Sequence, residues 1–165
     1  MTTVTSQLNS VAGTFALTGK VVDEAIGRIP FARWYERPAD HSNHVLWLVG
    51  HLTRTRGLIT QQLRGQAGRL PLDPFFAGGQ PLLPDIEYPD PEQVVAAWRS
   101  ILSETQAALN AAADADLEKP SLANFPTLDG RVGGALAAGV FHESYHVGQL
   151  GYLTKWLGYP RLLNR

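Results

Sequence analysis

Apolar residues recur every three to four positions in four segments of the chain, which is the period of an amphipathic helix. The segments run from near 6 to near 29, from near 42 to near 63, from 90 to about 109 and from near 129 to about 157. No segment shows the sustained apolar–polar alternation that is typical of strands. The pattern therefore predicts an all-α fold with four helices.

Residues typical of helix ends support these limits. Pro30 stops the first segment and Gly65 follows the second, while Gly158 and Pro160 follow the fourth. The run Asp90–Gln93 combines an N-cap acid, a proline at the first helical position and a glutamine at the capping-box position. The third helix is therefore expected to begin there.

A long stretch from 65 to 89, rich in Pro and Gly, separates the second and third helices. A loop of this length is usually functional, or it indicates a wrongly assigned element. It can also return the chain along the bundle, because about 24 residues reach about 80 Å and a helix of about 23 residues spans about 35 Å. In that case helices two and three run parallel. The apolar residues of the crossover would then pack over the bundle like a lid: Phe75, Phe76, Leu82, Leu83 and Tyr88.

Composition narrows the class of protein. A chain of 165 residues suits a single domain, 1–165, with a substantial core. With 14 Lys and Arg against 15 Asp and Glu there is no basic stripe, so nucleic acid is not an expected partner. Only 18% of residues are charged, below the usual value of about 25%, and 44% are hydrophobic. We therefore expect apolar surface for a partner subunit, and a homodimer.

Two absences in the sequence bear on location and chemistry. The first residues lack a basic region followed by an apolar run, and no uninterrupted apolar stretch approaches about 18 residues, so we expect a cytoplasmic protein without a membrane segment. The sequence contains no Cys, which excludes thiolate zinc sites and a cysteine nucleophile. Any metal site must use histidine and oxygen ligands.

The fourth segment carries the most informative pair of residues. His142 and His146 are four residues apart, so both imidazoles lie on one helix face, and Gln149 extends the same stripe. This stripe is also the expected core stripe. It continues through small residues, which would leave a vacancy beside the histidines unless Trp47 or Trp98 fills it: Ala135, Ala138 and Gly139.

A third histidine, His51, lies on the apolar face of the second segment, between Leu48 and Thr55. Three buried neutral imidazoles without a shared partner would be unfavourable, whereas a divalent ion satisfies all three. His44 is seven residues away, a rise of about 10.5 Å, which is too far to share the ion with His51. We expect His44 to be exposed rather than to line the mouth of the site, and His41 to lie on a surface loop.

Two other interpretations compete with a three-histidine metal site. The pair could be ordinary core or surface histidines. The letters His-Glu-x-x-His also spell a zinc-protease motif, with Glu143 as general base. That motif needs a third ligand downstream, but no Asp, Glu or His follows His146, and the longer form needs Gly and His where Gln149 and Tyr152 stand. Because Glu143 is about 100° from the ligand face, we expect it on the helix surface or behind the ligands.

Taken together, these motifs resemble the DinB/YfiT superfamily of metal-binding four-helix proteins. The resemblance covers nearly the whole chain. It includes His51 in Leu-Val-Gly-His-Leu, the long crossover, the Tyr-Pro before the third helix, the His-x-x-x-His-x-Gly-Gln signature from His142 to Gln149, and the run Leu153–Gly158. The resemblance implies an up-down-down-up bundle in which His51, His142 and His146 hold a divalent ion, with open positions for water or substrate. Members with known activity are mostly thiol-dependent transferases or isomerases that use mycothiol, bacillithiol or glutathione, and homodimers are common among them.

The leading hypothesis is therefore a metal-dependent enzyme in which zinc, nickel or iron lowers the pKa of a bound thiol or water and promotes S-transfer to a small electrophile. Glu143 or Tyr145 could handle protons. Arg54 and Arg56 could bind an anionic thiol cofactor if they border the mouth of the site. A metal-dependent hydrolase and a non-catalytic, stress-associated metal-binding bundle remain the alternatives.

Overall fold

The computed structural model describes residues 7–70, 72–73, 75–77, 82, 87–123 and 125–163. Within these residues it contains four α-helices, two short 3-10 helices and no strand: α1 Gln7–Arg28, η1 Phe31–Arg33, α2 Val45–Arg64, α3 Pro91–Ala111, η2 Asp114–Glu118 and α4 Val132–Trp156. Each α-helix begins and ends within three residues of its predicted limits. The predicted all-α fold is confirmed. The expected start of the first helix near 6 lies outside the described residues, as do Leu83 and several prolines of the crossover.

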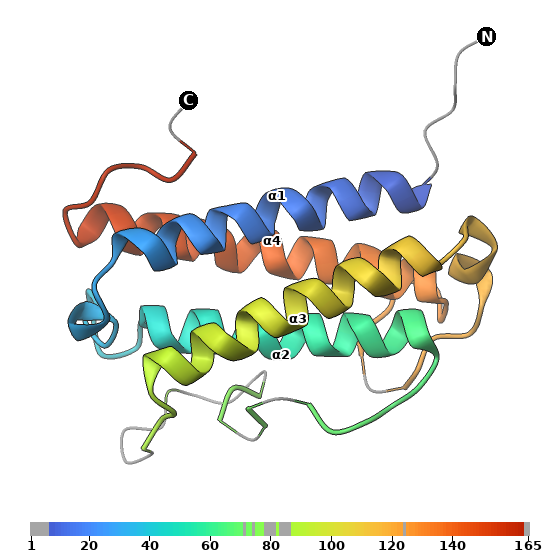
Figure 1. The fold of residues 1–165 in the computed structure, drawn as a ribbon, viewed down its shortest axis with the longest axis horizontal. Coiled ribbons are helices and arrows are strands. Elements are labelled where there is room, and N and C mark those ends of the chain that lie inside the picture. Colours follow the sequence, from blue (N-terminus) through green and yellow to red (C-terminus); the bar gives the residue numbers. More distant parts are fainter. Residues whose placement is uncertain are drawn as a thin grey trace, which may run out of the picture.

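The four helices form an up-down-down-up bundle (Figure 1). α1 lies beside α4, and α2 packs against both α3 and α4. α2 runs antiparallel to α1, α3 runs parallel to α2, and α4 returns in the direction of α1. The parallel course of α2 and α3 is the arrangement expected from the long crossover between them.

Local residues account for the helix ends. The side chain of His44 caps α2, since its Nδ1 accepts a hydrogen bond from the backbone N–H of Trp47 at 3.0 Å. Gly65 ends α2 in the left-handed conformation with φ of 64°, which favours glycine. At α3 the side chain of Gln93 accepts a hydrogen bond from the backbone N–H of Asp90 at 3.3 Å, as the capping box predicts.

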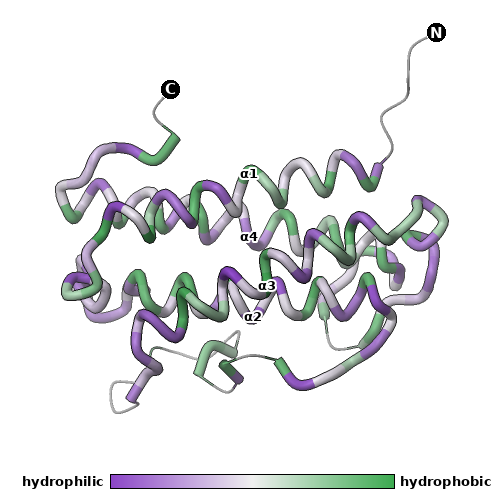
Figure 2. The backbone as a smooth tube through the Cα atoms, in the orientation of Figure 1, coloured by the Kyte–Doolittle hydropathy of each residue, from purple (hydrophilic) through white to green (hydrophobic). Residues whose placement is uncertain are grey.

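The core consists of two apolar clusters. Each helix carries both apolar and hydrophilic residues along its length (Figure 2). The larger cluster includes Trp34, Leu48, Trp98 and Leu150, and the smaller one contains Phe15, Ile59 and Leu136. Between them lie buried polar residues from all four helices: Thr18, Arg56, Thr60, Thr105 and Glu143. A polar layer therefore crosses the bundle at mid-height.

The described residues of the crossover lie along α2, on the side away from α1 (Figure 1). Phe76 is fully buried in the larger cluster, and the ring of Tyr88 stacks on it with centroids 5.6 Å apart. Leu72, Phe75 and Leu82 are half-buried against the same cluster. For the described residues, this confirms the prediction that apolar side chains of the crossover pack over the bundle.

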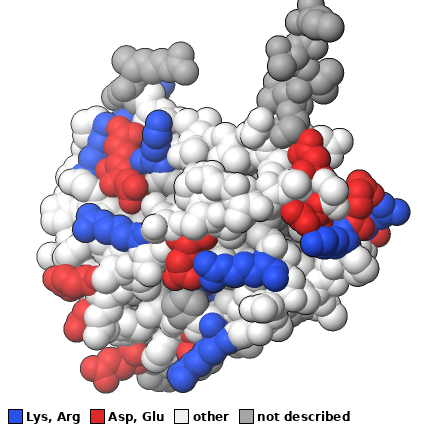
Figure 3. Space-filling model, turned by 45° about the vertical axis from the view of Figure 1, so that its right-hand side comes forward, with Lys and Arg blue, Asp and Glu red and all other residues white. Residues whose placement is uncertain are grey.

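The surface carries charges of both signs. On the face in Figure 3, Lys and Arg side chains lie beside Asp and Glu, with uncharged residues between these mixed groups. Within the described residues, no helix is both long and apolar enough to span a bilayer.

Candidate metal site

Three histidines from two helices converge inside the bundle. His51 comes from α2, and His142 and His146 come from successive turns of α4. One ring nitrogen of each lies within 4.8 Å of the others, and the Nε2 atoms of His51 and His142 are 3.0 Å apart. Nitrogens around one tetrahedral zinc ion lie about 3.3 Å apart, given zinc–nitrogen bonds of about 2.0–2.1 Å. The spacing fits a shared divalent ion.

Hydrogen bonds to the far nitrogens orient two of the rings. His51 Nδ1 lies 2.8 Å from the carbonyl oxygen of Phe76, and His146 Nδ1 lies 2.9 Å from Oε1 of Gln149. Because both oxygens can only accept, each Nδ1 carries the hydrogen and each Nε2 keeps its lone pair. Such outer partners are typical of metal-binding histidines.

His142 differs from the other two histidines. Its Nδ1 is buried and has no hydrogen-bond partner among the described residues. Since Nε2 of His51 holds a lone pair, the 3.0 Å contact between the two Nε2 atoms requires a hydrogen on His142. A divalent ion would instead accept all three Nε2 lone pairs, so the donor set fits a metal.

The histidines are neutral at pH 7. Burial lowers the pKa of His51 and of His142 to about 4, and it also lowers the pKa of His146. Metal binding requires neutral imidazole. The protein interior therefore holds the three histidines in the protonation state that an ion would need.

Close packing surrounds the three histidines. The indole of Trp47 stacks on His51 with ring centroids 4.5 Å apart and an interplanar angle of 12°, and it meets His146 edge-on at 5.9 Å. The vacancy expected beside Gly139 is absent, because a Cβ atom there would lie 2.3 Å from Cδ1 of Ile59. The prediction allowed for a bulky neighbour that fills this space; at Gly139 that neighbour is Ile59 rather than Trp47 or Trp98.

Gly50, which precedes His51, has a specific packing role. A Cβ atom at this position would lie 2.5 Å from two ring atoms of Phe76 and 2.6 Å from a third. The glycine therefore lets the Phe76 ring lie against α2, where the carbonyl of the same residue reaches His51. Gly50 belongs to the Leu-Val-Gly-His-Leu motif seen in the sequence. No feature of the sequence, however, indicated that the main-chain oxygen of Phe76 would accept a hydrogen bond from His51.

Glu143 is buried, not on the helix surface as one expectation had it. Only 1% of it is exposed, and its carboxylate accepts hydrogen bonds from Arg56 Nε and Nη2 at 2.5 Å and from the hydroxyl of Thr18. Arg56 also donates to the carbonyl of Phe15 at 2.6 Å and is 2% exposed. Arg56 therefore does not border the mouth of a site, which was the condition for its expected role with an anionic cofactor.

The other candidate residues lie nearer the surface. Arg54 donates to Asp73 of the crossover at 2.6 Å. Tyr145 is 59% exposed, and its ring packs edge-on against His146 with centroids 5.1 Å apart. His41 is exposed, as expected. His44 is only 6% exposed, so its expected exposure was wrong; its side chain is turned inward to cap α2.

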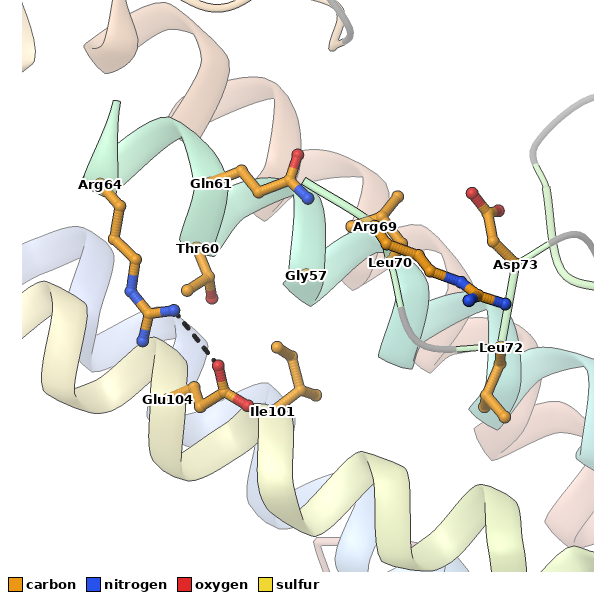
Figure 4. Close-up of a pocket in the computed structure, with 10 residues that line it drawn as sticks. All are labelled: Gly57, Thr60, Gln61, Arg64, Arg69, Leu70, Leu72, Asp73, Ile101 and Glu104. Carbon is orange, nitrogen blue, oxygen red and sulfur yellow. Dashed lines mark hydrogen bonds and ion pairs between the residues drawn. The ribbon is translucent and has the colours of Figure 1, made fainter. Parts of the chain in front are cut away.

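Two hollows of about 520 Å³ each lie in the surface. The first, between α2, α3 and the crossover, is lined by ten residues (Figure 4): Gly57, Thr60, Gln61, Arg64, Arg69, Leu70, Leu72, Asp73, Ile101 and Glu104. Arg64 pairs with Glu104 across it at 3.3 Å. Gly57, the lining residue nearest to His51 along α2, is six residues away, about 9 Å. This hollow is therefore separate from the histidine cluster.

The sequence profile of the DinB superfamily matches residues 14–150, a span that includes all three histidines. The chain belongs to the DinB superfamily. A solved structure with the same fold, titled the conserved protein of locus from Enterococcus faecalis, shares 17% identity with this DinB-superfamily chain at a TM-score of 0.63. The similarity covers 90% of this chain and 95% of that one. No curated protein matches the chain.

Proposed function

We propose that this DinB-superfamily chain is a cytoplasmic, divalent-metal-dependent enzyme that transfers the sulfur of a low-molecular-weight thiol to a small electrophile. One observation carries the proposal. Three neutral imidazoles converge, and within the described residues no carboxylate joins their group as a fourth ligand. Three protein ligands are typical of catalytic sites, which keep a position open, whereas structural zinc sites are usually closed by four.

A zinc, nickel or iron ion held by His51, His142 and His146 would lower the pKa of a bound thiol, and so would provide a thiolate nucleophile at neutral pH. In the proposed reaction the thiol sulfur bonds to the electrophilic carbon, and the leaving group departs with the electron pair of the broken bond. The thiol proton passes to solvent. The protein's own part is to orient the ligand rings and to shield them from water.

Tyr145 is our candidate for passing the proton to solvent, because its ring lies against His146 and its side chain is exposed. Glu143 is less suited to this role, since Arg56 and Thr18 already occupy both carboxylate oxygens. Arg54 remains our candidate for contact with an anionic thiol, because 19% of its side chain is exposed.

The test is a titration of the cobalt-substituted protein with 2-mercaptoethanol, with ethylene glycol as the matched compound that lacks sulfur. We expect the thiol alone to shift the visible cobalt bands. His142→Ala should abolish cobalt binding, while His41→Ala, which changes an exposed histidine outside the cluster, should bind normally. Equal responses to thiol and glycol would refute the transferase and favour a hydrolase. A site closed to both compounds, with unfolding on metal removal, would indicate a structural ion.

We also propose that the protein acts as a homodimer. Large apolar side chains exposed in the described part of the chain, outside the face of α4 that carries Tyr145 and Tyr152, support this: Leu17 and Leu128. Light scattering should give twice the mass of a single chain, and the mass of one chain at high concentration would refute the proposal.

A further inference from the structure

The second hollow lies beside the histidine cluster. It has a volume of about 520 Å³ and opens between the loop before α2 and the outer face of α4. Nine residues line it: Pro38, His41, Ser42, Asn43, Tyr145, Gly148, Gln149, Tyr152 and Leu153. No Lys, Arg, Asp or Glu is among them. Its position and its chemistry both point to a ligand.

Two residues of the pocket wall contact one histidine of the cluster, His146. Oε1 of Gln149 accepts one hydrogen bond from His146 Nδ1 at 2.9 Å and another from Asn43 Nδ2 at 3.3 Å. The ring of Tyr145 packs against the ring of His146. A molecule in the pocket that contacts Gln149 is therefore one hydrogen bond away from a ligand imidazole.

The lining selects for an uncharged molecule that carries a ring. Tyr145 and Tyr152 are 59% and 60% exposed, so their faces are free to stack on a flat ligand. The amides of Asn43 and Gln149 and the hydroxyl of Ser42 supply hydrogen bonds. His41 is the one imidazole in the lining; while it is neutral, a carboxylate or ammonium would lose hydration in the pocket without an opposite charge to replace it, which is unfavourable.

We propose that this pocket binds an uncharged, ring-bearing molecule with a carbonyl or amide group, and that Gln149 transmits its binding to His146. The pocket lies on the Nδ1 side of His146, away from the Nε2 atom that faces the other two histidines, so this ligand acts on the site through Gln149 and does not react there. Binding of the ligand class rests on the pocket alone.

Two glycines of α4 provide a matched test. A Cβ atom at Gly148 or at Gly151 meets nothing within 4 Å, but only Gly148 lines the pocket. Gly148→Leu should therefore fill the pocket without disturbing the core, while Gly151→Leu adds the same side chain elsewhere. The probe is benzamide, with benzoate as its charged counterpart, followed by NMR of the side-chain amides of Asn43 and Gln149 and of the His146 ring.

Benzamide should shift these signals in the wild type and in Gly151→Leu, and Gly148→Leu should weaken binding at least about tenfold, a loss of about 1.4 kcal/mol. Benzoate should bind at least about tenfold more weakly than benzamide. Equal binding of benzamide by the two leucine variants, or of the two probes by the wild type, would overturn the proposal. The result does not depend on the thiol test: if benzamide binds here but thiols leave the cobalt bands unchanged, the pocket stands and the transferase does not.

Discussion

Gly50→Ala is the sharpest test of how the crossover supports the metal site. The added methyl group would lie 2.5–2.6 Å from three ring atoms of Phe76. Carbon atoms in contact lie about 3.5–4.0 Å apart, so the ring must retreat by about 1 Å. The carbonyl oxygen of the same residue is 2.8 Å from His51 Nδ1, and a shift of that size breaks the hydrogen bond.

The expected loss of metal affinity is about 10–100-fold, the usual effect of removing an outer partner of a ligand histidine. The net loss of stability should be about 0–2 kcal/mol. Overpacking costs about 1–3 kcal/mol, but replacing glycine by alanine within a helix returns about 1 kcal/mol. We therefore expect a folded variant with a weakened site.

Affinity is measured by competition with a chromogenic chelator for zinc, and the His51 Nδ1 hydrogen is followed by NMR. Gly151→Ala is the control, because the same methyl group on α4 meets no atom within 4 Å. It should keep full affinity and gain about 1 kcal/mol of unfolding free energy. If Gly50→Ala binds zinc within twofold of this control while its His51 signal is unchanged, the crossover does not support the site as we argue.

Three further predictions concern the interior. Glu143→Ala leaves the buried guanidinium of Arg56 without its carboxylate partner and should lower the free energy of unfolding, measured by urea titration, by about 3–5 kcal/mol. Glu143→Leu combined with Arg56→Met removes both charges and should lower it much less. A loss below about 1 kcal/mol in Glu143→Ala would contradict this account. Burial lowers the pKa of His44 to about 4, below its ordinary 6.5, so folding disfavours the charged form of this side chain. Relative to His44→Asn, the metal-free wild type should keep its free energy of unfolding above pH 6.5 and lose about 3 kcal/mol as the pH falls towards 4. If the free energies of unfolding of the two proteins change in the same way with pH, His44 is not buried as a neutral cap of α2. Gln149→Leu should weaken zinc binding about 10–100-fold without lowering the Tm of the metal-free form, and unchanged affinity would show that His146 needs no orienting partner.

Much of the architecture could be predicted from the sequence, because helix periodicity and end residues are local signals. The three histidines of the cluster could also be found, since two of them share one helix face at a spacing of four residues and His51 interrupts an apolar stripe. Each of these features depends on residues close together in the chain.

The features that escaped prediction depend on distant partners. Glu143 was expected on the surface or behind the ligands because its partner, Arg56, lies 87 positions earlier on another helix. The small residue Gly139 suggested a vacancy because nothing in the sequence indicated that Ile59 would fill it. The carbonyl of Phe76 could not be found at all, since every residue has one and only the folded crossover brings this one to His51.

The indole of Trp47, parallel to a ligand ring, gives the protein a natural optical reporter. Its fluorescence is sensitive to a charge or a paramagnetic ion bound at the adjacent imidazole. Binding of nickel or cobalt should therefore lower the fluorescence intensity, while binding of zinc should mainly shift the wavelength of maximum emission. Arrival and departure of the ion can then be followed in real time without a dye, and replacing Trp47 by Phe identifies how much of the signal comes from this side chain.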